Sequence, residues 1–425
     1  MKLLSLVPFF DPSTRKWPSE ARFLQWLTGL WLTLGLIVLY SASFKVAIAE
    51  SGDGLYYLKR QLVGTLIGAV LMGFVVKTPI KQLSRFVTLG FFLCLGLIFA
   101  VKIPGVGVTV NGATRWIAVG PVPFQPSEIM KPLLVVQSAQ VFSCWSRLTN
   151  GQRWRWLIFF GMVLAGILIQ PNLSTASLCG MTLWLVAFSA GLSLRYLGLT
   201  VVGGVGLASV SISLAEYQRR RIMSFMDPWS DPLHDGYQLI QSLLGVGAGG
   251  LTGNGYGFSQ QKSYLPFQHT DFIFSVFADE FGLIGCLVLF GLLTLFSVFA
   301  VKIAIKSQQQ SHRLIAMGCL VLLLGQSLLH IGVTIGAFPT TGLPFPLISY
   351  GSNSLISSLL LAGLLVRVGR EMHRAEVVPM EGGRRLALVA PQLAERDASP
   401  RQTAAWRSWQ RRKALAKRKR SPNRS

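Results

Sequence analysis

Charged residues are scarce in this chain, and acidic residues are the scarcest. Only 13% of the 425 residues are Asp, Glu, Lys or Arg, and 17 of them are Asp or Glu. Soluble domains usually devote about a quarter of their residues to charged side chains. The shortage therefore excludes an ordinary soluble protein. Because 51% of the residues are apolar, the composition predicts a protein that lies in a membrane.

Cysteine is also rare, and no Cys-X-X-Cys pair occurs. All the cysteines lie in or at the ends of apolar runs, a pattern that argues against a zinc site, a redox motif or a disulfide framework. We expect them to be small apolar side chains packed between helices. The five residues are Cys94, Cys144, Cys179, Cys286 and Cys319.

Long apolar runs are what the chain has in abundance. A helix needs about 20 mostly apolar residues to cross a membrane, and ten runs meet or approach that length. The first run is not followed by the small-residue cleavage pattern of a signal peptide, so we expect it to be a signal anchor that stays in the protein. We therefore expect an all-α, polytopic membrane protein with ten transmembrane helices. The predicted spans are residues 24–43, 61–76, 86–101, 126–145, 154–169, 174–194, 196–214, 272–301, 314–335 and 346–366.

The placement of basic residues predicts the orientation. Net charge is +23, which in a soluble protein would suggest nucleic acid. Here Lys and Arg concentrate in residues 1–23, in the even-numbered connections and in the tail 367–425, so nucleic acid is not expected as a partner. The positive-inside rule places both termini in the cytoplasm, flanking a membrane domain over 24–366. The tail is predicted to be disordered, resting on anionic lipid or docking a partner.

Two connections on the extracytoplasmic side are candidates for chemistry. The connection between the seventh and eighth spans, residues 215–271, is 57 residues long, and loops longer than about 15 residues in a compact protein are usually functional. The connection 102–125 contains Arg115 and Trp116. Both should face the same compartment.

Asp271 is the sharpest catalytic candidate. The run 281–301 can cross the bilayer alone, so a straight helix rising about 1.5 Å per residue would put Asp271 about 15 Å outward, near the lipid headgroups. An Asp or Thr just before an apolar helix is also a common N-cap. Spacing alone favours the N-cap over a catalytic role for Asp271.

Other ionisable residues have alternatives of their own. Glu128 and Lys131 share a helical face, where they form either a structural ion pair or a substrate contact. Arg115, Lys262 and the run 219–221 either bind a diphosphate or sit in the membrane interface. His269 either orients a carboxylate or phosphate or is exposed. The segment GVGAGGLTGNGYG lacks the context of a nucleotide-binding loop.

Four segments together carry a resemblance to a known family. In chain order they are NGATRWIAVGPVPFQPSEIMK, GYQLIQSLLGVGAGGLTGNGYG, SYLPFQHTDFIF and PTTGLPFPLISYGSNSL. They resemble the signature segments of the SEDS family (shape, elongation, division and sporulation), over roughly residues 24–370. Within it, the chain is more similar to the division branch, FtsW, than to the elongation branch, RodA.

The resemblance implies a peptidoglycan glycosyltransferase that polymerises lipid II at the outer surface of the inner membrane during cell division. It implies Asp271 as the catalytic residue and a class B penicillin-binding transpeptidase, among other division proteins, as partner. A sugar hydroxyl would attack an anomeric carbon whose diphosphate leaves readily, so one base with cationic stabilisation suffices. Arg115, Lys262 or a divalent cation such as Mg²⁺ or Mn²⁺ would hold the departing charge.

The chain also departs from the family pattern. Phe267 and Asn172 replace carboxylates, which leaves Asp271 with fewer acidic neighbours, and Ser352 with Asn353 replaces a small-residue pair. Glu128 and Lys131 are expected to shape the cavity. Two rival functions stay open at this point: a transporter or flippase for the lipid-linked precursor, and a non-catalytic scaffold that recruits a transpeptidase.

Overall fold

The computed structural model describes residues 14, 17–110, 113–119 and 122–372. The basic tail from residue 373 and most of the predicted N-terminal segment lie outside the described residues. The elements, in chain order, are α1 (Ser19–Ser51), α2 (Tyr56–Lys77), α3 (Ile80–Ala100), β1 (Gly107–Val110), β2 (Ala113–Val119), β3 (Val122–Phe124), α4 (Pro126–Ser143), η4 (Trp145–Arg147), α5 (Asn150–Ile169), α6 (Leu173–Ser189), α7 (Leu194–Leu214), α8 (Glu216–Met226), η5 (Pro228–Ser230), α9 (Tyr237–Ala248), η6 (Gln261–Ser263), α10 (Ile273–Lys306), α11 (Gln310–Leu320), η7 (Val321–Gly325), α12 (Gln326–Thr334) and α13 (Ser352–Glu371).

Each predicted span coincides with helix over most of its length, which confirms an all-α, multi-pass membrane protein. Among the described residues, eight helical segments are long and apolar enough to cross a membrane. The other two predicted spans fall on α6, with 17 residues, and on α4, which carries Glu128 and Lys131 in its first two turns. The ninth crossing comprises α11, a π-helical turn and α12. The last span starts later than predicted, because residues 335–351 form a loop rather than helix.

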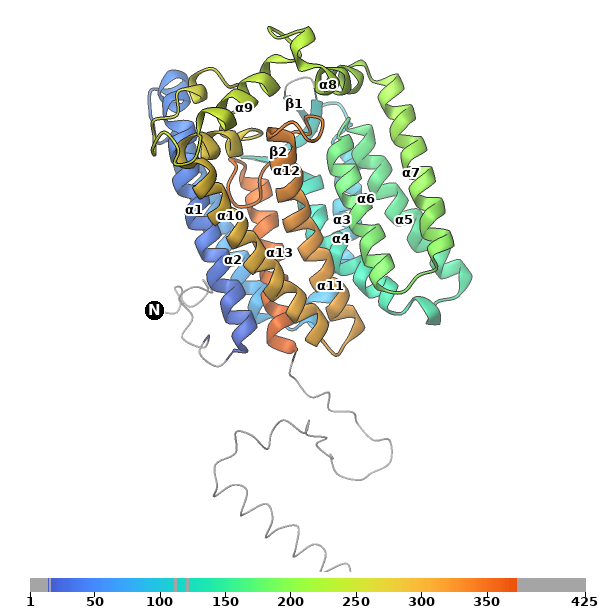
Figure 1. The fold of residues 1–425 in the computed structure, drawn as a ribbon. Coiled ribbons are helices and arrows are strands. Elements are labelled where there is room, and N and C mark those ends of the chain that lie inside the picture. Colours follow the sequence, from blue (N-terminus) through green and yellow to red (C-terminus); the bar gives the residue numbers. More distant parts are fainter. Residues whose placement is uncertain (1–13, 15–16, 111–112, 120–121, 373–425) are drawn as a thin grey trace, which may run out of the picture. The chain divides into compact units, whose positions relative to one another are not determined.

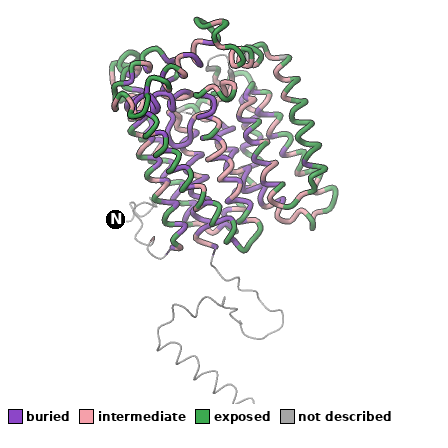
Figure 2. Tube along the Cα trace, in the orientation of Figure 1, coloured by how far each residue is buried: buried purple, intermediate pink, exposed green. Residues whose placement is uncertain are grey.

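Burial separates central helices from peripheral ones. In α13, 72% of the most apolar window is buried, whereas in α7 the corresponding share is 6%. Figure 1 shows α7 at the edge of the bundle, next to α5 and α6. Figure 2 shows buried residues along the middle helices and exposed ones on the outer faces. Since the exposed side chains include Leu199 and Phe86, these outer faces suit lipid tails rather than water.

A small sheet interrupts the helical pattern in the connection 102–125. β1 pairs with β2 and β2 with β3, both antiparallel, in the order β1-β2-β3. β-Branched Val, Thr and Ile favour strands here, and Pro123 lies on an edge strand, where a missing N–H is tolerated. The sheet, α8 and α9 all lie at one end of the bundle (Figure 1), which we call the sheet end.

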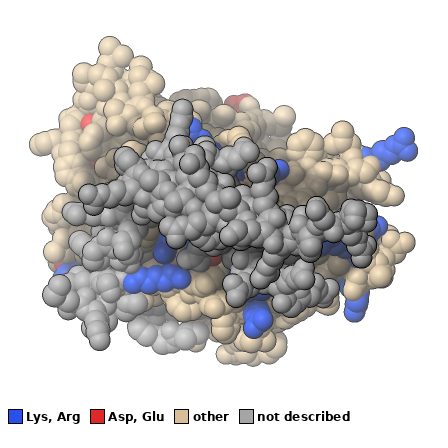
Figure 3. Space-filling view, turned by 90° about the horizontal axis from the view of Figure 1, so that it is seen from below, with Lys and Arg blue, Asp and Glu red and all other residues tan. Residues whose placement is uncertain are grey.

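The opposite end carries the basic residues that the orientation prediction used. α1 begins and α13 ends there (Figure 1). Figure 3 views the molecule from this side and shows Lys and Arg side chains gathered around it. Basic residues near the helix ends on this side are Lys77, Lys81, Arg85, Lys302, Lys306 and Arg313.

The glycine-rich segment packs into a break in α10. Gly282 has φ +62°, which is not helical, and the N–H groups of Leu283 and Ile284 bond to the carbonyls of Gly250 and Leu251 at 2.9 and 3.1 Å. A Cβ on Gly282 would lie 2.3 Å from the backbone nitrogen of Gly253. The straight helix assumed for the 15 Å estimate is therefore wrong, because another backbone occupies the bend.

Candidate functional site

Asp271 lies in a turn that precedes α10 at the sheet end. The backbone N–H groups of Thr270 and Asp271 both bond to the carbonyl oxygen of Phe267 at 3.0 Å. Phe267 itself takes φ +55°, a conformation that bulky residues rarely adopt. The helix starts at Ile273 with no side-chain cap. The N-cap alternative for Asp271 is therefore wrong, and its carboxyl group is left for other contacts.

The Asp271 side chain faces the loop 335–351. A Cβ placed on Gly342 would lie 3.6 Å from Asp271 Oδ2 and 3.9 Å from Nη1 of Arg221. Asp271 is half-buried, so it is not sealed inside the protein. Burial raises the pKa of its carboxyl above the ordinary value, while the charges of Arg221 and Arg115 oppose that rise. A carboxylate with a raised pKa has the properties of a general base.

Arg115, on β2, donates hydrogen bonds to the segment that connects α5 and α6. Its Nε donates to the carbonyl of Gln170 at 3.0 Å, and its Nη2 donates to that of Pro171 at 2.5 Å. Asn172, the neutral replacement noted in the sequence, accepts from the N–H of Thr175 at 3.3 Å and so caps α6. Arg115 thus joins the outer sheet to the start of α6, and its charge acts on Asp271.

The loop 335–351 is held from several sides. Ser174 at the start of α6 donates to the carbonyl of Thr341 at 2.9 Å. Ser349 Oγ donates to the carbonyl of Thr270 at 2.6 Å, and the N–H of Tyr350 donates to that of His269 at 2.8 Å. Hydrogen bonds therefore join the turn that carries Asp271 to the loop opposite it.

His269 contacts aromatic rings. Its ring lies 4.4 Å from that of Tyr57 and 5.8 Å from that of Tyr350, centroid to centroid. Burial lowers the pKa of His269, and the charge of Glu50 opposes the change. A neutral imidazole in an aromatic cluster is not the exposed histidine that the sequence allowed. Its predicted contact with substrate stays a prediction.

Lys262 is buried against another part of the protein. Its Nζ lies 3.1 Å from Glu280 Oε1 and donates to the carbonyl of Gly257 at 2.7 Å. Ser41 of α1 also bonds to this Glu280 oxygen. Lys262 Nζ donates to Ser41 Oγ as well, at 3.3 Å. The Lys262 ammonium thus has three protein partners, and its binding to phosphate stays a prediction.

Glu128 and Lys131 form the buried ion pair that one of the two sequence hypotheses described. Lys131 Nζ lies 2.7 Å from Glu128 Oε1 and also donates to Gln326 Oε1 at 3.0 Å. Gln326 in turn donates to the carbonyl of Pro344 at 2.6 Å. The pair therefore links α4 and α12 to the loop opposite Asp271. A direct role in substrate binding stays a prediction.

The candidate site does not offer a carboxylate cluster for a metal. Within the described ranges, no three His, Cys, Asp or Glu side chains come together as a ligand set. The two charged groups that act on Asp271 are guanidinium groups, which compete with a cation for the carboxylate. Mg²⁺ in proteins prefers carboxylates and phosphate oxygens. These residues alone therefore do not fit a resident divalent cation.

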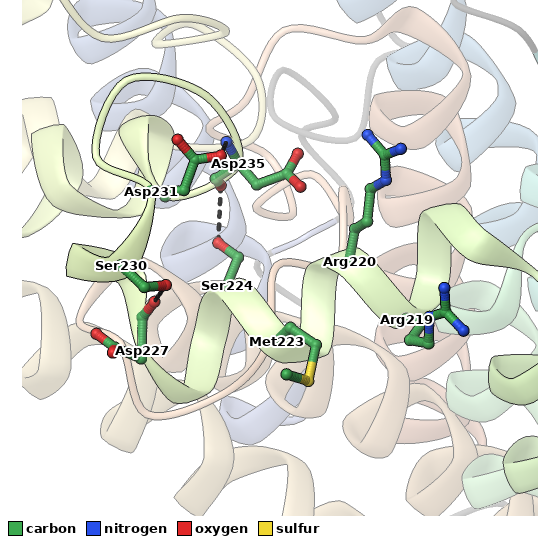
Figure 4. Close-up of a pocket in the computed structure, with 9 residues that line it drawn as sticks. Arg219, Arg220, Met223, Ser224, Asp227, Ser230, Asp231 and Asp235 are labelled. Carbon is green, nitrogen blue, oxygen red and sulfur yellow. Dashed lines mark hydrogen bonds between the residues drawn. The ribbon is translucent and has the colours of Figure 1, made fainter.

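A separate shallow pocket lies on the surface of the large loop. Its volume is about 220 Å³. Figure 4 shows Arg219 and Arg220 on α8, with Asp227, Asp231 and Asp235 in the segment that follows. Asp231 pairs with His234 at 2.9 Å. The arginines and aspartates that line the pocket carry opposite charges, which compensate one another at the surface. Arg221 is not among the lining residues.

Several residues around Asp271 were missing from the sequence prediction. Arg221 was considered only as part of a basic run, and Gly342, Thr340 and Ser174 were not singled out. Helical periodicity offers a signal for Arg221, because one residue in a run of three points to a given side of a helix. The backbone contacts of the loop 335–351 have no local signal.

Comparison with known proteins extends these observations. The family of cell cycle proteins that comprises FtsW, RodA and SpoVE matches residues 21–374. A protein of Synechocystis, named "Probable peptidoglycan glycosyltransferase FtsW", is 48% identical over 376 residues, covering 88% of this chain and 95% of that protein. Stage V sporulation protein E of Bacillus subtilis is 36% identical over 365 residues, covering 84% and 99%.

Solved structures show the same fold. A chain from a peptidoglycan synthase complex, described as coordinating polymerization and crosslinking, matches with a TM-score of 0.68 and 28% identity, covering 83% of this chain and 98% of that one. The rod shape determining protein RodA of Thermus thermophilus matches with a TM-score of 0.61 and 28% identity, covering 83% and 97%.

Proposed function

The chain belongs to the FtsW, RodA and SpoVE family of cell cycle proteins, and we propose that it is a peptidoglycan glycosyltransferase that polymerises lipid II during cell division. Relatives named as FtsW glycosyltransferases cover most of the chain, and none of these names supports the flippase alternative. One observation carries the assignment of the site: the carboxyl of Asp271, a half-buried residue, stands beside Gly342 within the influence of two arginines.

In the proposed step, Asp271 accepts the proton of the acceptor sugar hydroxyl. The hydroxyl oxygen forms a bond to the anomeric carbon of the donor. The bond from that carbon to the diphosphate oxygen breaks, and its electron pair leaves with the lipid diphosphate. Because this leaving group is stable as an anion, the step needs a base and cationic stabilisation but no protonated acid.

Arg115 is our candidate for the cation that meets the diphosphate. A guanidinium group presents several donors in a plane and suits phosphate oxygens. Arg115 lies in the sheet at the same end of the bundle as Asp271, and its charge acts on that carboxyl. We derive no step through a divalent cation. The cation predicted from the sequence is tested by polymerisation in EDTA and with Mg²⁺ or Mn²⁺ restored.

We further propose that the protein lies in the inner membrane, with both termini in the cytoplasm and the sheet end outside. The basic end supports this orientation under the positive-inside rule (Figure 3). The proposed place is the division septum, with a class B penicillin-binding transpeptidase and other division proteins as partners. The similarity to a chain of a peptidoglycan synthase complex supports the transpeptidase.

The test uses purified full-length protein, alone and with its transpeptidase, given lipid II in detergent. Wild type should form glycan chains, and Asp271→Asn should lose at least about a hundredfold in rate. Asp235→Asn is the matched control, since it removes an exposed carboxylate from the same connection. Unchanged polymerisation by Asp271→Asn would remove this residue from the mechanism.

The rival functions give different results. A flippase would move lipid II across the liposome membrane without joining it into glycan. For a flippase, the quantity to compare between wild type and Asp271→Asn would be the rate of lipid II transport. A scaffold would bind the transpeptidase but form no glycan, and Asp271→Asn would change nothing. Polymer formed by the protein with a transpeptidase-inactive partner would exclude both.

A further inference from the structure

Three consecutive arginines in α8 meet different surroundings. Arg219 and Arg220 are exposed, and Arg220 pairs with Glu216 one turn earlier at 2.6 Å. Arg221 is half-buried, and its Nη1 donates to the carbonyl of Thr340 at 3.0 Å. Because successive residues of a helix point about 100° apart, Arg221 faces the loop 335–351 while its neighbours line the surface pocket (Figure 4).

The contact of Arg221 lies beside Asp271. Its Nη1 and Asp271 Oδ2 are both within 4 Å of the point where a Cβ of Gly342 would stand. Thr340, which accepts the Arg221 hydrogen bond, is two residues from Gly342. A glycine at 342, with φ +66°, leaves that point free of a side chain. The carboxylate and the guanidinium therefore border the same small space.

The charges that face Asp271 come from two elements. Arg221 of α8 exerts the larger effect on the Asp271 carboxyl and Arg115 of β2 the smaller one. Both favour the ionised form, against the cost of burial. Arg115 is engaged with two carbonyls of the α5–α6 connection, whereas Arg221 is joined to the loop that borders Asp271.

We propose that Arg221 is a positioning residue for glycosyl transfer: it keeps the Asp271 carboxylate ionised, and so able to take the acceptor proton, and it holds the Gly342 loop beside that carboxylate. This inference rests on the proposed function. Arg221 acts through Asp271 and is not itself the proton acceptor. The other two arginines of the run have no part in this role.

The test is the pH dependence of the polymerisation rate at saturating lipid II. The rate should rise with pH as Asp271 ionises. In Arg221→Gln, the loss of a nearby positive charge raises the pKa of Asp271, so this acid limb should move to higher pH by roughly one unit. Arg221→Lys retains the charge and should keep the limb near its wild-type position. Arg220→Gln is the matched control and should leave the limb in place.

Other outcomes would overturn the proposal. A loss of rate in Arg221→Gln by the same factor at every pH would mark Arg221 as a structural brace. A raised KM for lipid II with an unmoved acid limb would mark it as a phosphate contact. A shift of equal size in Arg220→Gln would show a general effect of surface charge.

A second measurement does not need turnover. The difference in Tm between Asp271 and Asp271→Asn proteins, followed against pH, reports the ionisation of Asp271 in the folded state. When both proteins also carry Arg221→Gln, the pH at which this difference in Tm appears should be higher. Failure of the proposed function alone would abolish polymer but leave this shift, whereas an unmoved transition would overturn the inference alone.

Discussion

Lys262 and Glu280 form a buried ion pair, with 3.1 Å between Nζ and Oε1 and side chains that are 3% and 0% exposed. The lysine follows the glycine-rich segment, and the glutamate lies two residues before the break in α10. The pair therefore fastens the large loop to the helix that follows Asp271. The sequence offered Lys262 as a phosphate ligand, and the two roles predict different results.

Lys262→Met tests this pair. Removal of one partner leaves a buried charge unpaired, which usually costs about 3 kcal/mol or more, so the protein should unfold at a clearly lower temperature. Thermal unfolding in detergent measures the change. Lys45→Met, at an exposed lysine that contacts Ser263, is the control and should have little effect. Normal stability with a raised KM for lipid II would instead support phosphate binding.

Asp271→Asn should stabilise the protein at neutral pH while it abolishes activity. The folded-state pKa of Asp271 is raised, chiefly by burial, so the stability that this group contributes is present below its unfolded pKa and is lost as pH rises through the folded value. The variant should therefore melt above wild type at pH 7. The two should melt together in acid. Equal melting temperatures across the whole range would contradict the raised pKa.

Gly342→Ala should impair polymerisation. The residue has φ +66°, and its new methyl group would lie 3.6 Å from Asp271 Oδ2 and 3.9 Å from Arg221 Nη1. The control is Gly336→Ala in the same loop, where φ is +70° and the nearest atoms belong to Leu243. Both variants should lose about 1–2 kcal/mol of stability from backbone strain.

Activity separates those two glycine variants. Only Gly342→Ala should lose more polymerisation rate than its stability explains, because only there does the methyl group enter the space beside Asp271. Glycan formation is measured at a temperature where both proteins remain folded. Equal losses of rate in the two variants would show that strain alone is responsible.

Gly282→Ala should prevent normal packing of α10. Its Cβ would stand 2.3 Å from the nitrogen of Gly253, at φ +62°, and backbone atoms do not yield as a flexible side chain does. We expect little folded protein by gel filtration in detergent. Gly291→Ala, in the same helix with nothing within 4 Å, should be tolerated and is the control. A stable Gly282→Ala protein with native activity would mean that the break is not required.

The predicted spans and the observed helices agree best where a run of apolar residues is long. The run 281–301 predicts α10 because lipid imposes helix on any such segment. The prediction failed at residues 346–351, where apolar Leu347 takes φ +64° within a loop. Backbone groups of this loop are satisfied by contacts such as that of the Tyr350 N–H with the carbonyl oxygen of His269, and no pattern in the local sequence reports such partners.

The sequence alone determined the membrane class, the basic end of the bundle and the position of Asp271 just before a helix, because apolar length and charge placement are read directly along the chain. Only the tertiary structure decided what surrounds Asp271. Arg221, Arg115 and Gly342 come from α8, β2 and the loop 335–351, and their meeting depends on hydrogen bonds to backbone carbonyls of segments far apart in the chain. Every residue carries such a carbonyl, so residue identity does not show which carbonyl accepts the bond.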